Sequence, residues 1–243
     1  MKFALSILLL SVATAARAQT GLVARTGPMH TQLVELFTSE GCNSCPPAEE
    51  WMSGLRARSG LWTNFVPVAF HVDYWDHLGW PDRFSSPQFT ERQRAYVRTW
   101  RGDTMYTPCV VLDGNAWKLW RNLDAPPTPR SEKSGIVEIE TRGTNSFFVR
   151  FFPVGTGPWK FNAALFGSDI EVEVKAGENA GRTLRHDFTV LSYTNGPLAA
   201  TDPPSAEFTL GPTAEKPPET GIAVWITRRN STVPVQAAGG MLK

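Results

Sequence analysis

The stretch from Gln32 to Arg58 reads QLVELFTSEGCNSCPPAEEWMSGLRAR. Its opening apolar residues predict a strand over residues 32–37, and a short polar turn then leads to Cys42 and Cys45. The two prolines that follow suit a first helical turn, because their missing N–H groups would have no partner there. Apolar residues then recur at helical spacing, which predicts a helix over residues 48–58. The two cysteines are therefore expected where a strand passes into a helix.

The segments after this stretch repeat the alternation of strand and helix patterns. Apolar runs predict strands over residues 65–72 and 106–114. The arginine-rich segment 87–100 between them predicts a helix whose arginines face solvent. Strand, helix, strand, helix, strand is typical of an α/β layer structure around a mixed sheet.

The pattern changes near residue 125. Residues 126–134 hold three prolines, a composition typical of a stiff linker. Beyond the linker, short alternating segments separated by Gly and Pro predict strands over residues 136–140, 147–152, 159–166, 170–174, 188–193, 206–210 and 222–227. Such a succession favours an antiparallel sandwich. We therefore expect an α/β domain over residues 28–125, a linker over 126–134 and a β-rich, sandwich-like region over 135–243.

The first 18 residues have the layout of a secretory signal peptide. Lys2 supplies a positive charge, an apolar stretch follows, and Ala16-Arg17-Ala18 has the small-x-small pattern of a cleavage site. The apolar stretch is too short for a stable membrane anchor. The sequence therefore predicts a periplasmic or secreted protein with no membrane anchor in its mature chain, and it leaves the oligomeric state open. A net charge of +1 gives no electrostatic reason to expect a nucleic-acid partner.

Cysteine usage indicates chemistry more than architecture. The chain holds only Cys42, Cys45 and Cys109, too few to staple an exported protein of this length. At a helix N-terminus, unpaired N–H groups and the helix dipole favour a thiolate and lower the pKa of the first cysteine. We therefore expect Cys42 to attack and Cys45 to resolve the mixed disulfide. A half zinc site and an inert disulfide are the alternatives, although the sequence has no second CxxC to complete a zinc site.

Several motifs resemble the DUF1223 family of exported thioredoxin-like proteins. The similar segments are VELFTSEGCNSCPPAE (residues 34–49), FHVDYWD (70–76), GWPD (79–82), YTP (106–108), GEN (177–179) and GRTL (181–184). The resemblance implies a thioredoxin-like fold followed by a β region. It also implies that Pro108 is a cis-proline opposite the two cysteines and that the Thr107 backbone pairs with a bound peptide. The family usually has a polar residue such as Gln after Thr-Pro, where this chain has Cys109.

Other residues near the predicted strand ends are candidates for supporting roles. His71 and Asp73 follow the second strand at the sheet edge where α/β proteins gather ligands. They are expected either to shuttle a proton to Cys45 or to form local hydrogen bonds. Glu35 either tunes the dithiol as a buried acid or faces solvent. Cys109 opens the apolar run CVVL, which favours a buried, unreactive thiol.

These observations predict a thiol–disulfide oxidoreductase or thiol carrier that acts on cysteine-containing exported proteins without a cofactor. The sequence leaves open whether the protein is an enzyme and whether it oxidises or reduces its partners. One alternative is a periplasmic copper chaperone that binds Cu(I) through Cys42, Cys45 and Cys109, since thiolates suit that ion. Another is a non-catalytic binding protein whose β-rich region recognises a partner.

Overall fold

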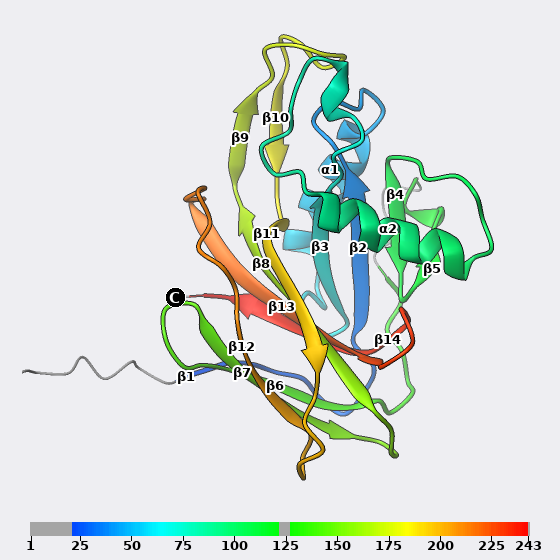
Figure 1. Ribbon diagram of the computed structural model, residues 1–243, viewed down its shortest axis with the longest axis vertical. Coiled ribbons are helices and arrows are strands. Elements are labelled where there is room, and N and C mark those ends of the chain that lie inside the picture. The colour runs from blue at the N-terminus through cyan, green and yellow to red at the C-terminus, as the bar shows by residue number, and fades with distance from the viewer. Residues whose placement is uncertain (1–20, 122–126, 243) are drawn as a thin grey trace, which may run out of the picture.

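A large sheet runs through most of the molecule (Figure 1). The computed structural model describes residues 21–121 and 127–242, so the predicted signal peptide lies outside the described residues. Eight strands form the large sheet. In pairing order they are β14 (Pro234–Met241), β13 (Glu219–Arg228), β8 (Trp159–Ser168), β11 (Thr189–Pro197), β3 (Phe65–His71), β2 (Gln32–Thr38), β4 (Cys109–Leu112) and β5 (Asn115–Ala116).

Two smaller sheets complete the fold. The four-stranded sheet contains β1 (Gly21–Arg25), β6 (Gly135–Thr141), β7 (Ser146–Pro153) and β12 (Ser205–Thr209), paired in that order. Buried and partly exposed residues alternate along β6 and β7, and their buried side chains pack against those of β8 and β13. The third sheet is a hairpin of β9 (Ile170–Glu173) and β10 (Thr183–His186). The end of this hairpin positions the candidate site.

This architecture corrects the fold class that the sequence suggests. We expect an α/β thioredoxin-like domain followed by a β-rich region, but 43% of the described residues are in strands and 14% are in helices. The large sheet contains strands from both sides of the predicted linker, because β11 pairs in parallel with β3 at Thr189 and Ala69. The Ala69 N–H donates to the Phe188 carbonyl (2.8 Å). Periodicity predicts individual strands, but it does not reveal pairing between segments so far apart in the sequence.

Helices cover both faces of the large sheet near the ends of β2 and β3. They are α1 (Pro46–Gly54), α2 (Pro87–Thr99) and the 3₁₀ helices η1 (Leu55–Ala57), η2 (Asp76–Leu78) and η3 (Leu119–Arg121). Thr38 Oγ1 donates to Glu49 of α1 (2.5 Å), whereas the Phe37 ring contacts Tyr96 of α2 (6.1 Å between centroids). Because neighbouring strand residues point to opposite faces, α1 and α2 lie on opposite faces. Both helices overlap the predicted ones, and neither has the length and apolar character needed to cross a bilayer.

The face under α2 holds a buried ion pair. Arg92 Nε donates to Glu35 Oε1 (2.6 Å), and the Tyr96 hydroxyl donates to the other carboxylate oxygen. The Glu35 side chain is inaccessible, and the Arg92 guanidinium lies 4.7 Å from the Trp225 ring centroid. The prediction that the arginines of this helix face solvent is therefore wrong for Arg92. Glu35 is a buried acid, but it lies on the face opposite to α1.

A second buried pair lies at the other end of β2. His30 Nε2 is 2.9 Å from Asp113 Oδ2, and His30 Nδ1 is 2.8 Å from the Val235 carbonyl oxygen. Both ring nitrogens therefore face acceptors, which favours the charged imidazole with two N–H groups. Burial alone lowers the pKa of His30, but the hydrogen bond and negative charge of Asp113 outweigh it and raise that pKa. This pair ties β2 to the loop after β4 and to β14.

Candidate functional site

The disulfide between Cys42 and Cys45 lies at the start of α1. The Cα atoms of the two cysteines are 5.4 Å apart, and Cys45 is the N-cap residue of the helix. The strand β2 ends at Thr38, so a short turn connects it to the disulfide. The predicted placement at a strand-to-helix junction is confirmed. The division into an attacking Cys42 and a resolving Cys45 stays a prediction.

The sulfur atoms are covered although the loop between them is exposed. Cys42 and Cys45 are each 0% exposed, whereas Asn43 and Ser44 face solvent. A methyl group on Gly41 would lie 3.1 Å from Trp75 Cβ, so the loop after β3 packs directly on the turn that leads into the disulfide. Any exchange reaction with a large partner therefore requires part of this cover to move.

The turn between β9 and β10 forms a second part of the cover. The Asn179 side-chain amide donates to the carbonyl oxygens of Glu40 (2.8 Å) and Cys42 (3.0 Å). The Asn43 N–H donates to Glu178 Oε2 (3.2 Å). Asn179 is itself 0% exposed. The segment 174–182, from the second half of the chain, thus holds the disulfide loop in place.

Thr107 and Pro108 lie at the same edge of the sheet. The Thr107–Pro108 peptide bond is cis, which confirms the cis geometry expected from the family resemblance. Pairing of the Thr107 backbone with a bound peptide stays a prediction. Phe37 of β2 pairs antiparallel with Cys109 of β4, so Pro108 lies beside the end of β2 that leads to the disulfide. Trp75 Nε1 donates to Thr107 Oγ1 (2.8 Å). Trp75 therefore joins Thr107 to the turn that carries the cysteines.

His71 and Asp73 have different surroundings. The His71 ring is 1% exposed, and its Nδ1 lies 2.7 Å from Asp82 Oδ2. The Thr90 hydroxyl of α2 donates a hydrogen bond to the Asp73 carboxylate (2.5 Å). The backbone N–H of Asp73 donates to the Thr90 hydroxyl oxygen (3.2 Å), so Asp73 is bound to α2 by two hydrogen bonds. The proton-shuttle hypothesis stays a prediction. The alternative prediction was that both residues form local hydrogen bonds, and such bonds are present for His71 and for Asp73.

A cluster of buried ionisable side chains lies between α1, the end of β3 and the hairpin. Its members are Glu40, Glu49, His71, Asp82 and His186, each at most 6% exposed. His186 joins two of the acids: its Nε2 lies 3.2 Å from Glu40 Oε1, and its Nδ1 lies 3.2 Å from Glu49 Oε2. The Trp80 indole N–H donates to the other oxygen of Glu40 (2.6 Å). We call these five side chains the buried cluster.

Charges within the buried cluster shift the pKa values of three of its members, Glu49, Asp82 and His186. Burial alone lowers the pKa of His186, but the negative charges of Glu49 and Glu40 outweigh it and raise that pKa to about 10. Burial tends to raise the pKa of Glu49, yet His186 beside it lowers that pKa overall. Burial also tends to raise the pKa of Asp82, but His71 and hydrogen bonds from two backbone N–H groups lower that pKa overall. Glu49 and Asp82 therefore stay ionised in an environment closed to water.

Cys109 is a buried thiol in the core. It is 1% exposed and packs among apolar residues of the large sheet. Burial raises the pKa of the Cys109 thiol to about 11. The prediction that Cys109 is buried is confirmed. The prediction that it is unreactive stays a prediction. Binding of Cu(I) by all three cysteines stays a prediction.

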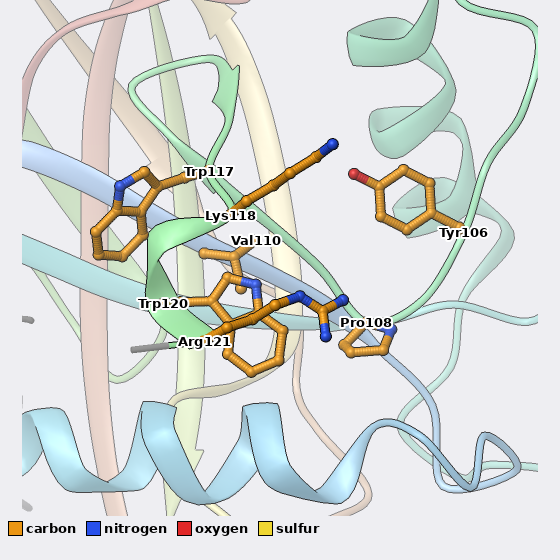
Figure 2. A pocket seen from close by; sticks show the side chains of 7 residues that line it. All are labelled: Tyr106, Pro108, Val110, Trp117, Lys118, Trp120 and Arg121. Carbon is orange, nitrogen blue, oxygen red and sulfur yellow. The ribbon is translucent and has the colours of Figure 1, made fainter. Parts of the chain in front are cut away.

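A shallow pocket of about 400 Å³ adjoins Pro108. Figure 2 shows the side chains that line it: Tyr106, Pro108, Val110, Trp117, Lys118, Trp120 and Arg121. The Trp51 ring of α1 contacts the rings of Trp117 (5.5 Å) and Trp120 (6.3 Å between centroids). The helix that begins at the disulfide therefore packs against the wall of the pocket. Aromatic surface and two cationic groups suit an extended peptide that carries apolar and acidic side chains.

The chain is similar to a protein family and to two solved structures. A family model described as a protein of unknown function, DUF1223, matches residues 33–227. The chain belongs to the DUF1223 family. This DUF1223 protein is similar to a solved structure of a protein from Agrobacterium tumefaciens, with 25% identity, a TM-score of 0.60, and 88% of this chain and 94% of that chain covered. It shares its fold with HBP35 of Porphyromonas gingivalis, with 12% identity, a TM-score of 0.57, and 89% and 76% coverage. No curated protein matches the chain.

In this DUF1223 protein, sequence reasoning missed most of the buried cluster. Glu40 precedes the CxxC by two positions, and Glu49 lies four positions after Cys45, one helical turn away. That spacing is a usable signal for Glu49, because it places the carboxylate on the face of α1 that carries the cysteine. His186 gave no comparable signal, since its approach to His71 depends on the pairing of β11 with β3.

Proposed function

We propose that this DUF1223 protein is an exported thiol–disulfide exchange protein whose reactive group is the Cys42–Cys45 disulfide. The observation that carries the proposal is the disulfide itself, closed across two residues at the N-terminus of α1. Unpaired N–H groups and the helix dipole at such a position stabilise the thiolates that exchange releases. The predicted signal peptide would bring the protein to compartments where client proteins form disulfides.

The exchange is balanced without a cofactor. A client thiolate attacks Cys42 Sγ, the bond between Cys42 and Cys45 breaks, and Cys45 leaves as a thiolate. A second client thiolate then attacks the client sulfur of the mixed disulfide and releases Cys42 as a thiolate. The client gains a disulfide and loses two electrons to the protein. The reverse sequence, begun by Cys42, reduces a client disulfide.

The pocket beside Pro108 supports a peptide-like client. Pro108, directly before β4, lines the pocket, and the tryptophans of its wall contact α1. A client segment in this pocket would pass close to the loop that covers the disulfide. Thr107 and Pro108 are in this proposal positioning residues for the client backbone, and Tyr106, which is 43% exposed, offers it an aromatic surface.

Trapping tests the proposal directly. In the mature chain with Cys45→Ser, Cys42 has no resolving partner, so mixed disulfides with exported clients should accumulate and disappear on reduction. Cys42→Ser is the matched control, because it keeps one thiol of the pair but lacks the attacking one. Each variant also carries Cys109→Ala, which removes the third thiol. Equal trapping by both variants, or none by either, would contradict the proposal.

A structural disulfide is the second candidate, and the complete burial of both sulfurs favours it. The two functions predict different reduction potentials. Structural disulfides in secreted proteins typically have potentials below about −300 mV, whereas exchange proteins span about −270 to −120 mV. Equilibration of the protein with dithiothreitol redox buffers measures the potential. A value below about −300 mV would assign the disulfide to stability.

A further inference from the structure

We propose that Glu49, His71 and His186 bind a divalent transition-metal cation as a two-histidine, one-carboxylate site. The three side chains come from α1, the end of β3 and the end of β10. One ligand atom from each lies within 4.8 Å of the other two. This site is independent of the proposed exchange at the disulfide, since none of its ligands is a cysteine.

The distances fit a small cation. Zn²⁺ binds histidine nitrogen and carboxylate oxygen at about 2.0–2.2 Å, so neighbouring ligand atoms of a tetrahedral ion are roughly 3.3 Å apart. His186 Nδ1 and Glu49 Oε2 are already 3.2 Å apart. The ligand atoms of the three side chains lie up to 4.8 Å apart, so binding requires side-chain shifts that close a gap of up to about 1.5 Å.

Histidine nitrogens without hydrogen-bond partners indicate that the buried cluster binds an ion. Among the described residues, His71 Nε2 and both ring nitrogens of His186 have no hydrogen-bond partner of acceptable geometry, although both rings are at most 2% exposed. Buried polar atoms almost always have a partner, because an unpaired one loses its hydration without compensation. A cation bound to His71 Nε2 and His186 Nδ1 would satisfy two of these atoms at once.

The surroundings supply the second layer of bonds that metal sites use. Ligating histidines usually donate their other N–H to a carboxylate, which fixes the ring and its tautomer. His71 Nδ1 lies 2.7 Å from Asp82 Oδ2, and His186 Nε2 lies 3.2 Å from Glu40 Oε1. Each histidine therefore has one nitrogen facing a carboxylate and one facing the proposed ion.

The carboxylate ligand is supported in the same manner. Thr38 Oγ1 donates to Glu49 Oε1 (2.5 Å), which leaves Oε2 for the ion. Both acids that would support the histidines are also held by donors: the Trp80 indole N–H binds Glu40, and the Phe84 N–H binds Asp82 (2.9 Å). Glu49, His71 and both supporting acids are thus oriented by hydrogen bonds outside the site, and His186 Nε2 lies within ion-pair distance of Glu40.

Charge balance favours a divalent ion. Glu40, Glu49 and Asp82 bring three negative charges into a space closed to water, and buried charge is costly unless it is compensated. A protonated His186 would offset one of these charges, whereas a divalent cation held between two neutral imidazoles would offset two and leave a single net negative charge. Two histidines and one carboxylate match the ligands of zinc centres that keep an open position, and of non-haem iron(II) centres. The proposed class is therefore a first-row divalent cation, with Zn²⁺ as the probe.

The test measures metal bound to the folded, oxidised chain. The mature protein, purified without a histidine tag and with its disulfide closed, is incubated with Zn²⁺, desalted and analysed for metal content. We expect one Zn²⁺ per chain. The variants Glu49→Gln and His186→Gln should each weaken Zn²⁺ binding at least 100-fold, whereas His77→Gln, on the exposed helix η2, should leave it unchanged. Circular dichroism confirms that each variant folds.

If those variants misfold, the visible absorption of Co²⁺ bound to the wild-type protein tests the proposal instead. Co²⁺ in the wild-type site should show the visible absorption of a low-symmetry site with nitrogen and oxygen ligands, and Zn²⁺ should displace it. A folded wild-type chain that retains no Zn²⁺ and gives no such Co²⁺ spectrum would overturn the proposal and leave the buried cluster as an ion-pair network. Thiolate-to-cobalt charge transfer would overturn it as well, because the metal would then be bound by cysteine.

Discussion

Replacing Asn179 with alanine should expose the disulfide to reductants. The Asn179 amide makes two hydrogen bonds to loop carbonyls, at 2.8 and 3.0 Å, from a side chain that is 0% exposed. Each such bond contributes about 0.5–1.5 kcal/mol net, so their loss lowers the free energy of opening this turn by about 2 kcal/mol. Because the sulfurs react only when uncovered, the rate of reduction should follow the open population. A change of about 2 kcal/mol corresponds to a roughly 30-fold faster reduction.

The assay follows reduction by dithiothreitol with acid quenching and a mass-tagging alkylating reagent. Asn145→Ala, at an exposed turn between β6 and β7, is the matched control and should reduce at the wild-type rate. Urea unfolding of each variant separates local opening from a general loss of stability. An unchanged reduction rate in a folded Asn179→Ala variant would refute the argument that segment 174–182 controls access.

Two further predictions concern the buried ion pairs. Arg92→Met leaves the carboxylate of Glu35 without its cation and should destabilise the protein by about 3–5 kcal/mol in urea unfolding, whereas Arg94→Met on the exposed side of α2 should cost far less. The folded-state pKa of His30 is raised by Asp113, so the stability it contributes is complete below about pH 6.5 and is lost as the pH rises through the folded-state pKa. The melting temperature of wild type should therefore fall more steeply above pH 6.5 than that of His30→Gln, and equal slopes would contradict the assignment.

Local structure around the cysteines could be predicted from the sequence because it depends on neighbouring residues. The prolines after Cys45 and the apolar spacing of the following residues are sufficient to predict α1, and the apolar run at Phe65 predicts β3. These signals act within one element, where propensity and periodicity apply. The strands of the second half were predictable for the same reason.

The joined sheet and the buried cluster could not be predicted in this way. The pairing of Ala69 with Thr189 depends on the shapes of whole elements, and no period in the sequence records it. Glu40 and Glu49 are charged residues that sequence reasoning places on a surface, since such residues are rarely buried without partners. Their partner His186 lies more than 130 positions later, so neither its burial nor its contacts are visible locally.

The position of β11 between β8 and β3 also has a consequence for synthesis. The seven residues of β3 are all buried in the finished molecule, and the strand that pairs with its outer edge begins 118 positions after β3 ends, from His71 to Thr189. At about 5–20 residues per second, a ribosome needs roughly 6–24 s to add that many residues. During this interval the edge of β3 has no permanent neighbour. A nascent chain of this protein is therefore a natural client for holding chaperones until its last third has emerged.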